Sequence, residues 1–236
     1  MEGNVFMIND IPWDTPICQY MRLDYFISLL VTKEYFVRPR CEFDDVFEVN
    51  LPMPKMFPIH EAAKIVSPAV LNDECQKMSE KLKVNRENGN LLTSCWCLQT
   101  YENMLMWNCY ASKIGVRITS TIRRFLISLN TDIYDVLCGC MSYTGYSFYN
   151  DDLYFTKDRG YQNEDEYRFY LIPKVYFPAT DTNKPKPVRL KVEPSVLIKD
   201  AIVSPYIETR VANEICELIK NRYRIVMRTS SLKTNG

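Results

Sequence analysis

The sequence predicts an α+β fold: a single domain over residues 1–236, with flanking helices and a mixed, mostly antiparallel sheet that is either continuous or split. Hydrophobic residues make up 47% of the 236 positions, which is enough to bury one sizeable core. Patterns typical of short strands and of helices follow one another without regular βαβ alternation. The chain has no G-x-G-x-x-G motif and only seven glycines, which argues against Rossmann and P-loop folds.

The first part of the chain predicts a helix, a strand, a loop and a second helix. Residues 22–32 have apolar side chains at the spacing of an amphipathic helix. These side chains are Leu23, Phe26, Ile27 and Leu30. Residues 33–39 read as a short strand that Pro39 ends. Three prolines make residues 51–60 a surface loop, and residues 71–89 have the composition of a polar, solvent-facing helix.

The centre of the chain is predicted to alternate strands with helices. Runs rich in β-branched and apolar residues indicate the strands. The predicted strands are residues 90–99, 115–120, 133–143 and 163–173, and the predicted helices are residues 102–112 and 121–130. In the first of these helices, Met104, Trp107 and Ala111 share one side.

The last part of the chain predicts a flap, two strands and a helix. Residues 180–190 have the composition of an exposed hairpin loop, and residues 198–205 read as a strand. Ser204 and Pro205 are expected to cap and begin the helix that follows. The predicted apolar stripe of that helix is Ile207, Val211, Ile215 and Leu218. Residues 223–230 are predicted to form the final strand.

The charge balance excludes a strong global attraction to polyanions. Lysine plus arginine and aspartate plus glutamate each number 29, so the formal net charge is zero. A nucleic-acid partner therefore stays undecided, because it would need a local basic patch. The residues that could form one are Arg123, Arg124, Lys220, Arg222, Arg224 and Arg228, although a solvated face is the ordinary reading. No apolar run approaches the roughly 18 residues of a membrane span, so no membrane partner is expected.

The cysteines predict free thiols in a cytoplasmic protein. Nine cysteines is an odd number, and the first residues lack the basic and apolar regions of a secretory leader. The pairs Cys95/Cys97 and Cys138/Cys140 have C-x-C spacing, which puts both sulfurs on one strand face and differs from the C-x-x-C spacing of zinc sites. His60 is the only histidine, so no metal is expected.

The most informative stretch for function is residues 163–169, NEDEYRF. On a regular strand, Glu164, Glu166 and Arg168 would share one face, with Asp165, Tyr167 and Phe169 on the other. Two carboxylates side by side repel one another unless a cation, a hydroxyl or a shared proton lies between them. The ordinary interpretation is a surface ladder in which Arg168 neutralises its neighbours, and the alternative is a functional site.

Three segments in this order resemble the bacterial domain-of-unknown-function family twenty-nine seventy-one. They are RPRCEFDDVFE (38–48), MLMWNCYASKIGVRI (104–118) and FTKDRGYQNEDEYRFY (155–170). The family shows an F-N-D-P-F-E-like box, an M-W-x-x-Y-x-x-x-x-G-[VC] box and a K-x-x-x-[WY]-x-x-E-x-E-x-R box. In this sequence Asp44 and Val46 replace the asparagine and proline of the first box, and the basic residue of the opening Y-[KR]-Y motif is missing.

More distantly, two features resemble ADP-ribosyltransferase-type folds, in which a split antiparallel sheet clasps NAD. They are the aromatic-basic start followed by a helix ending in LLVTKEYFV (29–37) and the E-x-E motif on a later strand. The resemblance implies that NAD is a substrate, that Glu166 holds its ribose and that Glu164 orients or deprotonates the acceptor. It also implies that Tyr20 or Tyr110 stacks on nicotinamide. The diphosphate would then meet Arg22 or Arg38, because a planar guanidinium suits phosphate oxygens.

Two other classes of function stay open. One is a catalytically silent nucleotide- or protein-binding module whose pocket is lined by Trp107, Tyr110 and the row that ends in Arg168. The other is a metal-dependent nuclease that uses Asp44, Asp45 and Glu48, although an acidic turn is the ordinary reading of those residues. As an enzyme, the protein would be a toxin or a phage-defence effector with a nucleotide ligand, a macromolecular acceptor or a cognate antitoxin.

Overall fold

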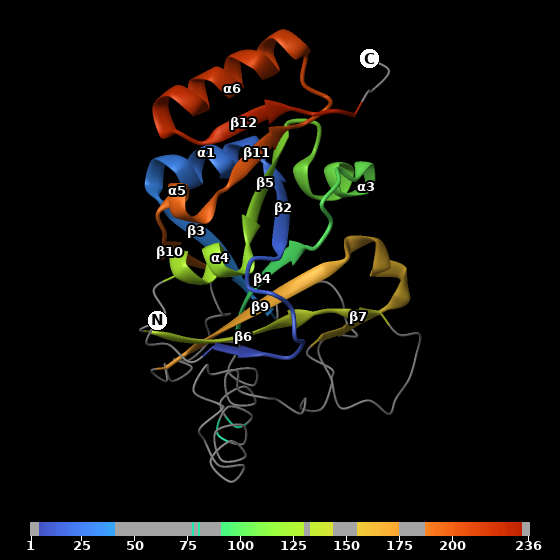
Figure 1. Ribbon diagram of the computed structural model, residues 1–236, viewed down its shortest axis with the longest axis vertical. Helices are drawn as coiled ribbons and strands as arrows, with labels where there is room; N and C mark the ends of the chain where they lie inside the picture. The colour runs from blue at the N-terminus through green and yellow to red at the C-terminus, as the bar shows by residue number, and fades with distance from the viewer. Residues whose placement is uncertain are drawn as a thin grey trace, which may run out of the picture. The chain divides into compact units, whose positions relative to one another are not determined.

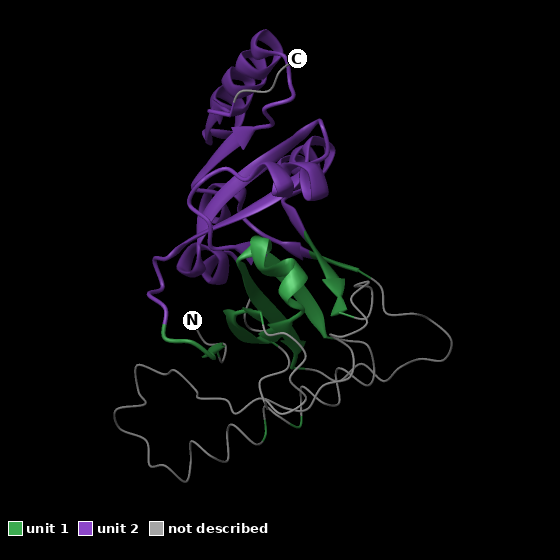
Figure 2. Cartoon of the chain, turned by 90° about the vertical axis from the view of Figure 1, so that its right-hand side faces the viewer, with its two compact units in different colours: residues 1–10, 36–95, 131–189 green, residues 11–35, 96–130, 190–236 purple. Residues whose placement is uncertain are grey.

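The computed structural model describes residues 5–40, 91–129, 133–143, 155–174 and 187–232, together with Lys77 and Glu80. It is an α+β fold with a mixed sheet, as the sequence predicts. The chain forms two compact units (Figure 2). Unit 1 comprises residues 1–10, 36–95 and 131–189, and unit 2 comprises residues 11–35, 96–130 and 190–236. The prediction of one domain stays a prediction.

Unit 1 is built on strands that lie side by side in the order β1-β6-β9-β4 (Figure 1). These strands are β1 (Val5–Met7), β6 (Tyr134–Cys140), β9 (Glu166–Pro173) and β4 (Leu92–Cys97), the last of which ends in unit 2. Strand β1 runs parallel to β6, and β6 runs antiparallel to β9. Phe6, Leu137, Phe155 and Tyr170 pack together as part of its core.

Three short elements lie between β6 and β9 in the chain. Strands β7 (Ser142–Tyr143) and β8 (Thr156–Lys157) pair in parallel as a separate small sheet. A 3₁₀ helix, η6 (Arg159–Glu164), then leads to β9. The Asp158 side chain caps η6 by accepting a hydrogen bond from Gly160 N at 2.7 Å.

Unit 2 is built on the strand order β2-β5-β11-β12. The strands are β2 (Pro16–Arg22), β5 (Gly115–Thr121), β11 (Asp200–Val203) and β12 (Val226–Thr229). Strand β5 is antiparallel to β2 and β11, whereas β11 and β12 are parallel. Strands β3 (Glu34–Pro39) and β10 (Val188–Lys191) pair with each other, and each begins in one unit and ends in the other.

In Figure 1 the helices of unit 2 lie on both sides of β2 and β5, except α6 (Thr209–Tyr223), which lies beside β12. The others are α1 (Leu23–Thr32), α3 (Met104–Met106), α4 (Ile122–Ser128) and α5 (Pro194–Leu197). Helix α3 continues directly into a π-helical turn, η4 (Trp107–Ala111), and in Figure 1 α3 lies on the side of β2 opposite to α1. Local capping explains several boundaries: the Thr121 hydroxyl accepts from Arg124 N at the start of α4, and Lys33 adopts the left-handed conformation at the end of α1.

Most predicted elements are confirmed, with shifts of a few residues at their ends. Of the predicted strand 133–143, β6 ends at Cys140 and a separate β7 begins at Ser142. The reason is the partner strand: β9 begins at Glu166, so it has no residue left to pair with Ser142, which pairs with β8 instead. The prediction of one continuous strand was wrong because it ignored where the partner ends.

Two predictions about α6 were also wrong. Its cap is Glu208, whose carboxylate accepts from Arg210 N at 3.1 Å. Ser204 begins a turn before the helix, where its hydroxyl accepts from Tyr206 N and donates to Lys113 O. The buried stripe is Ala212, Cys216 and Ile219, while the predicted stripe members Val211 and Leu218 are 46% and 57% exposed. Packing beside β12 therefore rotates the helix by one residue from the most apolar face.

Several predicted features lie outside the described residues. They are the loop at 51–60, nearly all of the helix at 71–89, His60, the acidic residues Asp44, Asp45 and Glu48, and the flap up to residue 186. Within the described part of the chain, no helix combines the length and the apolarity that crossing a bilayer requires.

Candidate functional site

The E-x-E-x-R row does not lie on one regular strand. Strand β9 begins at Glu166, and Glu164 is the last residue of the 3₁₀ helix η6. Between them, Asp165 is left-handed, with φ 44° and ψ 55°. Aspartate tolerates this conformation better than most residues, and it interrupts the alternation of side chains that the sequence prediction assumed. Only Glu166 and Arg168 share a strand face in the predicted way.

Lys157 nevertheless holds the carboxylates of Glu164 and Glu166 close together. Its Nζ lies 2.7 Å from Glu164 Oε2 and 3.4 Å from Glu166 Oε2, so one ammonium group bridges both glutamates. Lys157 comes from β8 and also lies over the Tyr161 ring, with Nζ 4.5 Å from the ring centre. The cation that the sequence requires between two adjacent carboxylates is therefore this lysine.

Arg168 holds Glu166 from the other side. The guanidinium Nε lies 2.6 Å from Glu166 Oε1 and its Nη2 lies 2.9 Å from Oε2, a bidentate ion pair. The remaining Nη1 donates to the Tyr170 hydroxyl at 3.1 Å. Glu166 and Arg168 are 3% and 1% exposed, so this pair lies in the interior of unit 1, contrary to the surface-ladder interpretation.

The ion pairs fix the charge of the site. Burial alone would raise the pKa of Glu166, but Arg168 and Lys157 outweigh it and lower that pKa to about 2. Burial likewise works against the charge of Lys157, yet Glu166 and Glu164 raise its pKa. At neutral pH the cluster therefore contains a carboxylate and an ammonium group that both stay ionised. Their charges balance locally.

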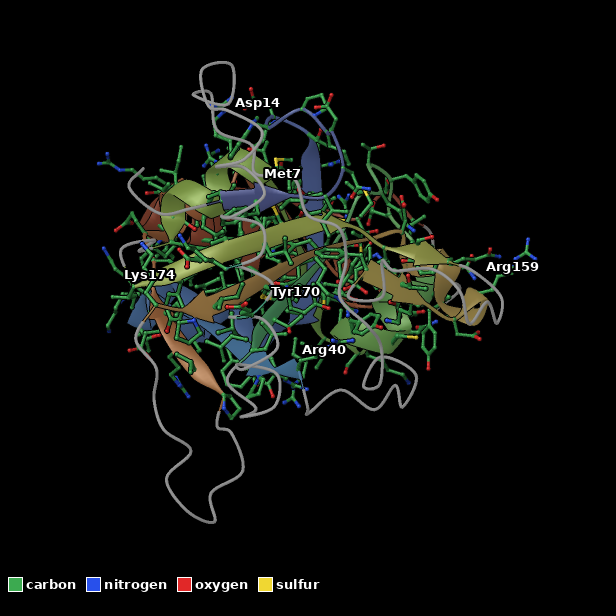
Figure 3. All side chains as sticks on the ribbon, turned by 90° about the horizontal axis from the view of Figure 1, so that it is seen from below. Met7, Asp14, Arg40, Arg159, Tyr170 and Lys174 are labelled. Carbon is green, nitrogen blue, oxygen red and sulfur yellow. The ribbon has the colours of Figure 1, made fainter. Side chains whose placement is uncertain are left out.

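Neighbouring side chains hold the start of β9 in place. The Glu166 amide donates to the Tyr143 hydroxyl at 2.7 Å, and burial raises the pKa of that tyrosine, which keeps it protonated. Arg40 lies over the Tyr170 ring at 5.7 Å, and Figure 3 labels both residues. The same view shows Arg159, at the start of η6, extending outward from the ribbon. The cluster is thus buried on the strand side and nearer the surface at η6.

Two of the predicted aromatic residues meet inside unit 2. Tyr20 on β2 and Trp107 on η4 pack edge to face, with ring centres 4.9 Å apart. The Tyr20 hydroxyl accepts from Asn103 N at 2.9 Å, and Trp107 is fully buried. Both rings are therefore core residues of unit 2, whereas the resemblance implied that Tyr20 stacks on nicotinamide and the binding-module alternative used Trp107 to line a pocket.

The remaining predicted site residues are exposed. Arg22 forms a bidentate pair with Asp24 at 3.0 and 2.7 Å, and Arg38 lies over the Phe36 ring at 5.8 Å. Tyr110 is 47% exposed on η4. Glu164, Glu166, Arg168 and Arg38 belong to unit 1, whereas Tyr20, Arg22, Trp107 and Tyr110 belong to unit 2.

Comparison with known proteins does not identify the chain. No protein-family model matches it, and no curated protein matches it either. The family resemblance and the assignment of NAD as substrate therefore stay predictions. Within the described residues, no group of histidine, cysteine, aspartate or glutamate side chains has the arrangement of a metal site.

Sequence reasoning missed two members of the unit 1 cluster, although its third box contained them. Lys157 and Tyr161 occupy the lysine and aromatic positions of K-x-x-x-[WY]-x-x-E-x-E-x-R. The structure joins all the box residues through ion pairs and one cation–π contact. The spacing alone could have indicated that the box describes one network rather than a strand face.

Proposed function

We propose that the protein is an ADP-ribosyltransferase-like enzyme that acts on NAD or another nucleotide. The observation that supports this is that Lys157 holds the two E-x-E carboxylates together and that Glu164 is the more accessible of the two. Cleavage of a nicotinamide–ribose bond develops positive charge on the ribose, and fixed negative charge at that position lowers the barrier. The E-x-E-x-R box is the sequence feature that carries the resemblance.

The burial of the two glutamates changes the roles that the resemblance implies for them. Glu166 is fully buried and bonded on both oxygens, so its role in this proposal is to fix Lys157 and the start of β9. The Glu164 side chain is 13% exposed and is the more accessible carboxylate of the two. We therefore assign the contact with the ribose or with the acceptor hydroxyl to Glu164, and a positioning role to Glu166.

The test is release of nicotinamide from NAD by the purified full chain. We expect release by the parent protein. We expect loss of release in Glu164→Gln with a smaller fall in the melting midpoint than in Glu166→Gln, because Lys157 keeps its contact with Glu166. Glu166→Gln should lose release and also melt at lower temperature, because it unbalances a buried ion pair. The matched control is Glu214→Gln, which breaks an exposed pair with Arg210 on α6 and should leave both quantities unchanged.

A non-catalytic binding module is the second candidate, and the burial of the cluster favours it. Glu166 and Arg168 neutralise each other inside unit 1, which is how a structural ion pair behaves. Thermal shift with NAD, ADP-ribose and divalent cations separates the candidates, because a ligand that binds only the native state raises the melting midpoint. Binding of NAD without nicotinamide release supports the module. A shift with cations alone supports the metal-dependent nuclease.

The biological setting follows from the same proposal. A cytoplasmic enzyme that consumes or transfers part of NAD would act as a toxin or a phage-defence effector, with a macromolecular acceptor or an antitoxin as partner. Co-expression of the Glu164→Gln variant beside the parent chain tests this setting. The parent should slow growth of the host cell and lower its NAD content, and the variant should do neither.

A further inference from the structure

A second polar cluster lies on one face of the sheet in unit 2, away from the E-x-E-x-R box in sequence. In the β2–β5 register Tyr20 pairs with Arg117, and Cys18 pairs with Thr119. Side chains two residues apart on a strand share a face, so these four residues form a patch on one face. Trp107 from η4 packs on the same patch against Tyr20. The Arg117 guanidinium lies 5.9 Å from the centre of the Tyr20 ring.

This patch has more hydrogen-bond donors than acceptors. Among the described residues, Arg117 Nε, Trp107 Nε1 and Thr119 Oγ1 are buried atoms with no hydrogen-bond partner. The Tyr20 oxygen accepts from Asn103 N, and burial raises the pKa of Tyr20 to about 12, so its own proton is a further donor. Buried donors left unpaired cost free energy, and natural proteins rarely retain several in one place without a reason.

The patch also contains a buried positive charge that neutral groups surround. Arg117 is 3% exposed, and its Nη2 donates to the backbone oxygen of Gln99 at 3.0 Å. Burial works against the charge of Arg117, while Cys18, which also forms a hydrogen bond with it, and Tyr20 raise its pKa more than Glu102 does. The Glu102 carboxylate accepts hydrogen bonds from Ser230 Oγ, Ser231 N and Ser231 Oγ. In the described part of the chain, no salt bridge reaches Arg117.

We propose that the Tyr20–Arg117 patch binds an oxyanion, the carboxylate or phosphate group of a small ligand. An oxyanion carries only acceptors, so it matches a surplus of donors, and its charge balances the buried guanidinium. This inference goes beyond the proposed function and does not rest on it. It assigns a role to Arg117 and Thr119, which no sequence motif singled out.

The segment that covers the patch has the features of a functional element. The turn η4 is π-helical, a form that is frequent at functional sites. It ends at Ser112, a non-glycine residue with φ 55° and ψ −170°. That conformation is strained for a residue with a side chain.

The experiment titrates the full chain with inorganic phosphate, pyrophosphate and acetate against sodium chloride of equal ionic strength. The readouts are the melting midpoint and tryptophan fluorescence. We expect an oxyanion to raise the midpoint beyond the chloride control and to change the fluorescence of Trp107. A response to phosphate or pyrophosphate alone identifies a phosphate ligand, and a response to acetate alone identifies a carboxylate ligand. No response to any of them overturns the proposal.

Three variants locate the site. Thr119→Val keeps the shape and removes one donor, so it should weaken binding about tenfold or more, since hydrogen bonds to charged groups are strong. Trp107→Phe should weaken binding and abolish the fluorescence change, and Arg117→Met should abolish binding. If Arg117→Met does not fold, the first two variants carry the test. Arg210→Gln on exposed α6 is the control, and equal binding by Thr119→Val and the parent overturns the proposal.

Discussion

At the residue scale, two arginine–carboxylate pairs in this chain have the same chemistry and opposite surroundings. Arg168 with Glu166 and Arg22 with Asp24 both join residues two positions apart through two hydrogen bonds. The first pair is almost completely buried, and in the second both side chains are more than half exposed. Water screens and competes for the exposed pair, whereas removing one partner of the buried pair leaves an unpaired charge in the interior.

The first prediction compares these two pairs. Arg168→Met should lower the free energy of unfolding by about 3–5 kcal/mol, because it leaves Glu166 buried with only Lys157 as a cation. Arg22→Met should change it by less than about 1 kcal/mol. Denaturant unfolding measures both. A double variant, Arg168→Met with Glu166→Leu, should recover part of the loss, and equal losses in the two single arginine variants would contradict the assigned burial.

The second prediction concerns pH. The folded pKa of Glu166 is depressed to about 2, below the value of about 4.3 expected for an unfolded chain. Its ionisation therefore contributes stability that is fully present above the unfolded pKa and is lost as pH falls toward the folded pKa. Between about pH 5 and pH 2 the parent should lose stability more steeply than Glu166→Gln. Urea unfolding at a series of pH values checks this, and parallel curves would rule it out.

At the element scale, the M-W-x-x-Y-x-x-x-x-G box describes how η4 approaches β5. Gly115 begins β5, and a Cβ added there would lie 2.4 Å from Ala111 O and 2.8 Å from Met21 O. Both contacts are with backbone atoms, which cannot rotate away. The box therefore encodes a close backbone approach that places Trp107 against Tyr20.

The third prediction tests that approach. Gly115→Ala should destabilise the protein by about 1–3 kcal/mol, because the added methyl group forces η4 away from β5. Gly160→Ala is the control, since its nearest neighbour is the movable Asp158 carboxylate at 3.1 Å. Thermal unfolding measures the loss, and near-ultraviolet circular dichroism should report altered packing of Trp107. If Gly115→Ala is as stable as the parent, the glycine of the box is not needed for the close approach of η4 to β5.

At the scale of the whole molecule, cysteine chemistry follows burial in both units. Every described cysteine is a free thiol, and Cys109 is the exposed one among them. Burial raises the pKa of Cys138 to about 12 and that of Cys140 to about 11, so both stay protonated near neutral pH. A protonated thiol is a poor nucleophile, which argues against a role for the β6 pair in covalent chemistry.

The fourth prediction is an order of reaction. Under native conditions iodoacetamide should modify Cys109 well before Cys18 or Cys138, and denaturant should make the three react at similar rates. Peptide mass spectrometry after timed quenching measures the order. Early modification of Cys138 in the native protein would show that β6 is more open than described.

The sequence by itself determined the local features. Helical spacing at residues 22–32, the strand of residues 115–120 and the E-x-E-x-R spacing each depend on neighbours in the chain, so the pattern is visible without the fold. The helical spacing also put Met104, Trp107 and Ala111 on one side, but it left open whether Trp107 lies in the core or lines a pocket.

Only the tertiary structure decided which charges meet and which faces are buried. Lys157 reaches Glu166 because β8, η6 and β9 fold back on one another, and Arg117 meets Tyr20 because β2 and β5 pair in one register. The buried stripe of α6 and the end of β6 were likewise set by partner strands. Such contacts join residues that are distant in the chain. Burial then makes a charged side chain part of an interior ion pair, where the sequence alone suggests a solvated surface group.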